Sequence, residues 1–143
     1  TIMESVPKVK LATKSRDKKI YGVVAGIEDR DKEQREFQKG IFVTTMERAS
    51  EDDYRVIVNA GGEGGIWVSN YNGNLENGDF ITTSSIPGIG MRQDDDLLHN
   101  YTVAKIVMKC DFDTKSDQYE TKIIEHKGKE YTMAFVACVY LIN

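Results

Sequence analysis

Two acidic residues in the middle of the chain are the best candidates for chemistry. Glu63 stands between four glycines in the sequence GGEGG (61–65), and Asp79 ends the sequence ENGD. Two carboxylates held close together repel each other when both are ionised. The pKa of one of them therefore rises, and the pair can act as general acid and base. If residues 65–70 pair with residues 77–85 as an antiparallel hairpin, the two carboxylates approach each other.

The same stretch also has a purely structural interpretation. The sequence Asn77-Gly78-Asp79 is typical of a turn, because asparagine and glycine adopt positive φ angles. Four glycines can form a tight corner before the strand that contains Trp67. Glu76 and Asp95 are the reserve candidates for a second acid, although the aspartate run 94–96 favours a solvated loop. The residues alone leave both interpretations open.

Other catalytic signatures are missing from the sequence. There is no HExxH, CxxC or GxSxG motif, and GGEGG lacks the pattern of a phosphate-binding loop. The chain has two histidines, His99 and His126. Their spacing does not pair either of them with a serine that could act as a nucleophile. The two cysteines, Cys110 and Cys138, are expected to be reduced core residues. We therefore expect neither a cofactor nor a metal.

Composition limits the class of protein. The chain has 143 residues, 29% of them charged, with a net charge of −4. This predicts one β-rich domain over residues 1–143 with no general attraction for nucleic acid. The apolar runs are too short to cross a membrane, and no signal peptide is visible. The chain begins at Thr1, as expected for a fragment of a longer protein.

Short strand-like segments recur along the chain. They lie at 7–13, 18–28, 40–47, 54–60, 65–70, 77–85 and 101–112, followed by a hairpin of 118–128 and 129–142 that turns at 126–129. This spacing predicts an all-β fold, a compact barrel or sandwich of short antiparallel strands with long loops and little helix. Residues 29–37 are expected to form a solvated loop, and residues 92–100 one short helical turn.

Three long stretches resemble a known viral family. They are YGVVAGIED (21–29), GEGGIWVSNYNGNLENGDFITTSSIPGIGMRQDD (62–95) and HNYTVAKIVMKCDF (99–112). Together they look like the C-terminal intramolecular-chaperone, self-cleaving domain of phage neck-appendage proteins and related viral fibre proteins. The resemblance covers about residues 5–112, and MAFVACVY (133–140) also fits.

The resemblance implies a module at the end of a trimeric appendage of a virion. Such a module promotes trimerisation and folding of the upstream fibre segment, and is then released by self-cleavage. The family is classed as a glutamic-type peptidase, and Glu63 and Asp79 are the residues here that match its acids. Cleavage would fall near or before Thr1, with no cofactor, nucleic acid or membrane involved.

Three classes of function follow from these observations. The first is an assembly module that forms a homotrimer, with apolar positions of GIWV (65–68) and AFVACVYLI (134–142) near the interface. The second is a self-cleaving peptidase that uses Glu63 and Asp79. The third is a receptor- or carbohydrate-binding fibre tip, in which Trp67, Tyr71 and Asn70 face a sugar.

Overall fold

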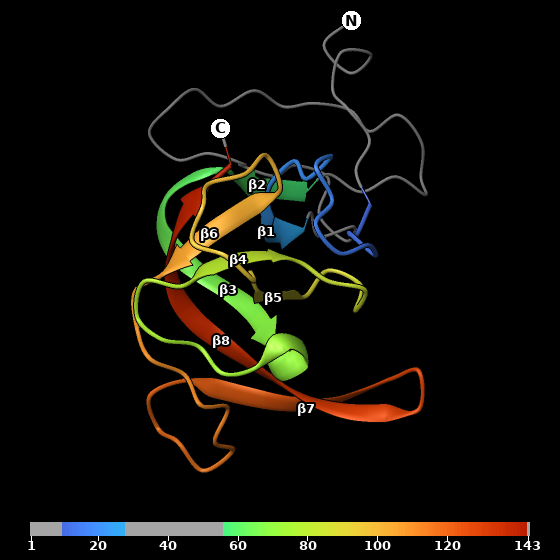
Figure 1. Ribbon diagram of the computed structural model, residues 1–143, viewed down its shortest axis with the longest axis vertical. Helices are drawn as coiled ribbons and strands as arrows, with labels where there is room; N and C mark the ends of the chain where they lie inside the picture. The colour runs from blue at the N-terminus through green and yellow to red at the C-terminus, as the bar shows by residue number, and fades with distance from the viewer. Residues whose placement is uncertain (1–9, 28–55, 143) are drawn as a thin grey trace, which may run out of the picture.

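The computed structural model describes residues 10–27 and 56–142, and it is almost entirely β-structure (Figure 1). The strands are β1 (Val23–Ile27), β2 (Val56–Asn59), β3 (Gly61–Ser69), β4 (Phe80–Thr83), β5 (Gly90–Arg92), β6 (Thr102–Ile106), β7 (Glu120–His126) and β8 (Lys129–Leu141). The only helix in the described part is the single 3-10 turn η1 (Asn70–Asn72). The predicted all-β class with little helix is therefore confirmed.

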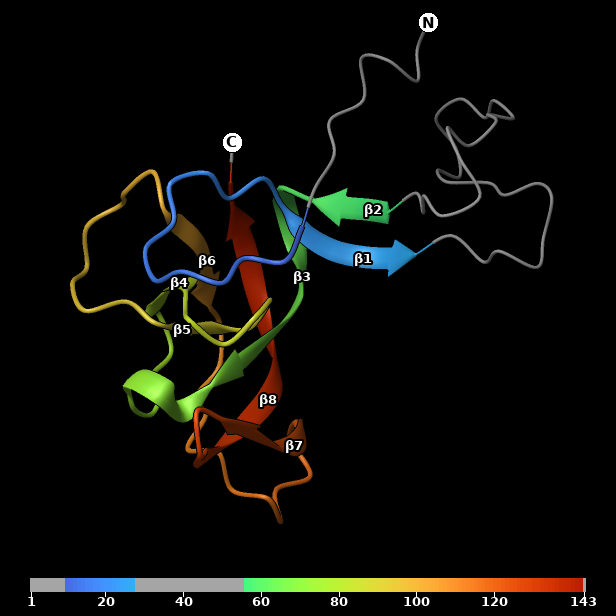
Figure 2. The ribbon, with the colours of Figure 1, turned by 90° about the vertical axis from the view of Figure 1, so that its right-hand side faces the viewer.

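The main sheet has six strands in the order β3-β5-β4-β6-β8-β7. It curls because β3 also pairs antiparallel with β8, from Gly61 opposite Leu141 to Ser69 opposite Met133. Only one residue pair, Val68 with Gly90, joins β3 to β5, and this pairing is parallel. The sheet is mixed because β3 and β5 are parallel whereas the other pairs are antiparallel. It is not a clean barrel, because β7 extends beyond the closed part (Figure 2).

The expected hairpin between residues 65–70 and 77–85 is wrong. The strand β5 lies between β3 and β4, and β4 pairs with β5 and β6 instead. The chain leaves β3 through η1 and a turn before β4 begins. A three-residue strand carries too little periodicity for its sequence to predict this insertion.

The predicted C-terminal hairpin is confirmed. Strands β7 and β8 pair from Glu120 opposite Phe135 to His126 opposite Lys129. The turn residues Lys127 and Gly128 have φ angles of 52° and 79°. Positive φ at both central residues is the geometry of a type I′ turn, which matches the twist of a hairpin.

The core lies inside the curled sheet. Alternate residues of β8 point into it, so the buried positions Ala134, Val136 and Cys138 are separated by more exposed ones. The core residues are Ile66, Val68, Leu75, Ile81, Val103, Ala104, Ile106, Cys110, Phe112, Ala134, Val136, Cys138 and Tyr140. Both cysteines are buried and free, as predicted.

The N-terminal segment 10–22 is fastened to the main sheet beside β4. The hydroxyl of Thr83 donates to the carbonyl of Lys14 (2.7 Å) and accepts from the backbone N–H of Asp17 (2.8 Å). The segment leads into β1, which pairs with β2 as a separate two-stranded sheet. The expected strand 7–13 does not form from residue 10 onward, and the segments 29–37 and 40–47 lie outside the described residues.

Residues 93–100 form a loop after β5, and the helical turn expected over 92–100 is not present. Within the described residues, no helix is long and apolar enough to cross a membrane.

Candidate functional site

The GGEGG sequence belongs to strand β3 and is not a corner before it. Gly64 and Gly65 sit beneath aromatic rings: a Cβ on Gly64 would lie 2.6 Å from Cε2 of Tyr140, and one on Gly65 would overlap the ring of Phe135. The Tyr140 hydroxyl also donates a hydrogen bond to the carbonyl of Gly65 (2.5 Å). The two glycines therefore let two rings lie against the strand backbone, one on each face.

Glu63 is exposed on this strand. It is paired with Val139 of β8, and its side chain takes part in none of the described hydrogen bonds or ion pairs. The flanking Gly62 has a φ angle of 83°, a conformation that favours glycine. The strand thus presents Glu63 to solvent without placing an obvious second acid beside it.

Asp79 closes a reverse turn. Its backbone N–H donates to the carbonyl of Glu76 (3.0 Å), and its carboxylate accepts from the backbone N–H of Glu76 (2.8 Å). Gly78, at the third position of the turn, has a φ angle of 101°. The turn interpretation of the sequence is correct, although only the glycine has a positive φ angle.

The structure brings Glu76 and Asp79 together in one turn and places Glu63 on a separate strand. No hydrogen bond between Glu63 and Asp79 is present among the described contacts, and the dyad stays a prediction. Within the described ranges, no group of three or more histidine, cysteine, aspartate or glutamate residues is arranged to hold a metal ion.

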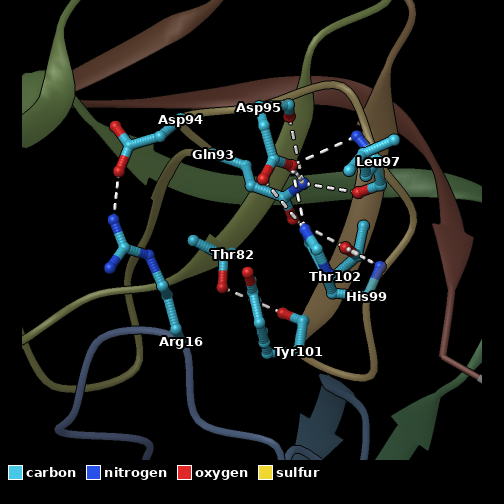
Figure 3. Close-up of polar contacts among 9 residues, drawn as sticks. All are labelled: Arg16, Thr82, Gln93, Asp94, Asp95, Leu97, His99, Tyr101 and Thr102. Atoms are coloured by element: carbon cyan, nitrogen blue, oxygen red, sulfur yellow. Dashed lines mark hydrogen bonds and ion pairs between the residues drawn. The ribbon is translucent and has the colours of Figure 1, made fainter.

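Asp95 lies in a loop that is held by a dense network of hydrogen bonds (Figure 3). Its Oδ1 accepts from the Gln93 side-chain amide (2.9 Å) and from the backbone N–H of Leu97 (3.1 Å). Both carboxylate oxygens lie 3.0 Å from Nε2 of His99. The hydrogen bond to His99, followed by that from Leu97, holds the pKa of Asp95 below its usual value.

This loop is anchored to the core by a buried pair. The Thr102 hydroxyl donates to Oε1 of Gln93 (2.6 Å) and accepts from the backbone N–H of His99 (3.0 Å). Both Gln93 and Thr102 are almost fully buried. Because each polar group serves another loop residue, the network is suited to fixing the loop and offers no free nucleophile.

The neighbouring Asp94 ties the loop to the N-terminal segment. Its carboxylate accepts from the side-chain amide of Asn72 (2.8 Å) and forms an ion pair with Arg16. These contacts, the Asn72 hydrogen bond first, lower the pKa of Asp94. An exposed pair of this kind contributes little to stability.

The two histidines do not form a catalytic triad with the groups described. His126 Nε2 lies 3.2 Å from the hydroxyl of Ser85, whereas the histidine with a carboxylate partner is His99. A triad needs the nucleophile and the acid on opposite nitrogens of the same imidazole.

An apolar groove of about 640 Å³ opens between the N-terminal segment, β1, β2 and the wall of the main sheet. Its apolar lining includes Ile20, Val24, Val58, Ile66 and Trp67. Val24 is 47% exposed, although it lies on a strand. Sequence patterning predicted the strands but not the groove, because the groove forms between segments distant in the sequence.

A row of four aromatic rings lies on the outer face of β3, η1 and β8. Trp67 packs against Phe135 (centroids 5.5 Å apart), and Tyr71 packs against Tyr131 (5.1 Å). The sequence singled out Trp67, Tyr71 and Asn70, but Asn70 uses its side-chain oxygen to accept from the backbone N–H of Thr132 (3.1 Å). Phe135 and Tyr131 were missed as surface residues because β8 reads as a continuous apolar strand.

These features define a β-rich chain with a curled mixed β-sheet, an apolar groove and an exposed aromatic surface. Comparison with known proteins found no matching family model, no matching curated protein and no matching solved structure.

Proposed function

We propose that the chain is an assembly module: its copies associate as a homotrimer through the apolar groove and so align a longer viral appendage or fibre protein. The observation that supports this proposal best is the groove of about 640 Å³ with its mainly apolar surface. Exposed apolar surface of this kind is typical of sites where another protein binds.

The pair of strands beside the groove also favours association. A two-stranded sheet is marginally stable unless it packs against something else. The strands β1 and β2 form such a sheet: Val23 packs against the core, whereas Val24 is exposed along the groove and Tyr21, just before β1, is 54% exposed. A neighbouring copy packed into the groove would cover these side chains and support the pair.

Association at one end of a long chain has a clear advantage for a fibre. Aligning three long chains without prior contact carries a large entropic cost. A compact module that trimerises first raises the effective concentration of the upstream segments for one another. This role requires no active site, cofactor or metal, and it places the module in the assembling virion.

A matched pair of substitutions tests the proposal. Val24→Glu places a charge in the groove, whereas Ile123→Glu places one on β7, where Ile123 is 57% exposed and outside the groove lining. We expect Val24→Glu to be monomeric at concentrations where the unsubstituted chain and Ile123→Glu are trimeric. Circular dichroism confirms that both variants fold. Unchanged assembly of Val24→Glu would contradict the proposed interface.

A further inference from the structure

The aromatic row and two lysines share one face of the sheet. Residues directly opposite each other on paired strands point to the same face. Trp67 is opposite Phe135, which is opposite Glu120, and Met133 is opposite Lys122. The side chains of Glu120, Lys122, Met133, Phe135 and Trp67 therefore lie on one face, the outer face of the curled sheet.

The row is long and partly open to solvent. Tyr71 is 40% exposed and Phe135 is 44% exposed, one in each ring pair. Tyr131 and Phe135 are four residues apart on β8, so the two ring pairs are about 13 Å apart along the strand. A surface of this length can contact several linked rings of a bound ligand in succession.

A lysine ammonium group lies over one ring of each pair. The ammonium group of Lys122 lies 5.1 Å from the ring centroid of Trp67, and that of Lys129 lies 5.5 Å from that of Tyr131. The described ion pairs join Arg16 with Asp94 and Asp95 with His99, so neither lysine is neutralised by a described carboxylate. A long ligand that carries negative charges at intervals along the row would meet both ammonium groups.

We propose that the aromatic row binds an anionic oligosaccharide, a chain of sugars that carries carboxylate or sulfate groups. Sugar rings present apolar C–H faces that stack on aromatic side chains, while their hydroxyls can bond to the tyrosine hydroxyls. Lys122 and Lys129 supply charge complementarity for the acidic groups. The row adjoins the groove, whose lining also includes Trp67, but its other three rings lie outside that lining and its ligand binding does not depend on trimer formation.

The charge distribution favours an acidic glycan over single-stranded nucleic acid. Nucleic acid carries a charge on every nucleotide and is usually bound by a continuous basic groove. Here two lysines face the row, Glu120 lies on the same face, and the chain as a whole has a net charge of −4. The site suits a ligand with widely spaced negative charges.

The single tryptophan of the chain gives a direct measurement, because Trp67 is part of the row. Its fluorescence is followed during titration with hexagalacturonate, a sulfated heparin-derived hexasaccharide, fully methyl-esterified hexagalacturonate and an octathymidylate. We expect at least one acidic hexasaccharide to change the fluorescence in a salt-sensitive way and to bind more tightly than the neutral ester and the octathymidylate.

Substitutions locate the ligand on the row. Lys129→Gln and Tyr71→Ala should each weaken binding about tenfold. Glu120→Gln should strengthen binding, because it removes the carboxylate on the same face. Glu125→Gln is the matched control, since Glu125 is paired with Glu130 on the opposite face of the hairpin and should leave affinity unchanged.

The proposal is overturned if neither acidic hexasaccharide changes the fluorescence, or if the neutral ester binds equally well. Tighter binding of the octathymidylate would assign the row to nucleic acid instead. Equal effects of Glu120→Gln and Glu125→Gln would show that net charge, and not this face, controls binding.

Discussion

The hydroxyl of Tyr140 donates a hydrogen bond to the carbonyl of Gly65, and its ring covers the adjacent Gly64. This relationship explains the glycine-rich sequence GGEGG, for which the sequence left open a catalytic Glu63 or a tight corner. Tyr140 is 5% exposed and belongs to the core, so its ring has little freedom to move aside. The glycines around Glu63 thus have a packing role that does not require chemistry.

Substitutions at the two neighbouring glycines should differ in their effect on stability. Gly64→Ala forces a methyl group into the ring of the buried Tyr140 and should lower the free energy of unfolding by roughly 1–3 kcal/mol. Gly65→Ala meets the ring of Phe135, which is 44% exposed and can swing outward, so its cost should be smaller. Urea unfolding of both variants measures the difference. Equal stability of the two variants would contradict the proposed difference between the fixed ring of Tyr140 and the more mobile ring of Phe135.

The carboxyl groups of Glu63 and Asp79 are tested by amide substitutions in a longer precursor. Because Glu63 lies on an exposed strand and Asp79 serves a turn, we expect Glu63→Gln and Asp79→Asn to fold, trimerise and be processed like the unsubstituted precursor. Asparagine keeps an oxygen that can accept the Glu76 N–H. Mass spectrometry detects processing. A folded trimer of Glu63→Gln that stays uncut would show that Glu63 is catalytic.

The loop centred on Asp95 should make stability fall at acidic pH. The pKa of Asp95 is lower in the folded state than its usual 3.8, so its stabilising effect is complete above that value and is lost as the pH falls through the folded-state pKa. Asp95→Asn should therefore be less stable than the unsubstituted chain at pH 5, and the difference should shrink toward pH 3. Urea midpoints at the two pH values measure this. Asp96→Asn is the control, and a pH dependence altered equally by both substitutions would contradict the role of Asp95.

The thiols should be unreactive in the folded protein. Burial raises the pKa of Cys138 to about 11 and also raises that of Cys110. Since the thiolate is the reacting form, a thiol reagent at pH 8 should label neither cysteine until urea unfolds the chain. Rapid labelling of Cys138 in the native protein would contradict this prediction and show that β8 opens locally.

Local patterns in the sequence predicted local structure well. The hairpin of β7 and β8 follows from alternating residues around Lys127-Gly128, and the turn at Asp79 follows from its neighbours. The pairing of segments that are distant in the sequence could not be predicted in this way. The partners of Gly64 and Gly65 are aromatic residues at the other end of the chain, and β5 separates two strands that a simple hairpin would join.

The loop at residues 93–101, which includes most of the stretch 92–100 in which a helical turn was expected, shows the same limit. Its composition suggested a helical turn, but the side chain of Gln93 donates to the carbonyl of Leu97 (2.7 Å) and its oxygen accepts from Thr102. These tertiary hydrogen bonds fix a non-helical path. Likewise, the groove and the aromatic row arise where distant strands meet, so neither has a contiguous sequence motif.

The molar mass of the chain in solution, measured by light scattering from micromolar to near-millimolar concentration, shows whether its copies associate as a trimer. We expect three times the mass of one chain for the unsubstituted protein and for Ile123→Glu, and the mass of a single chain for Val24→Glu. The mass of one chain throughout this range, for a folded and unsubstituted protein, would contradict the proposal that the module associates through its groove.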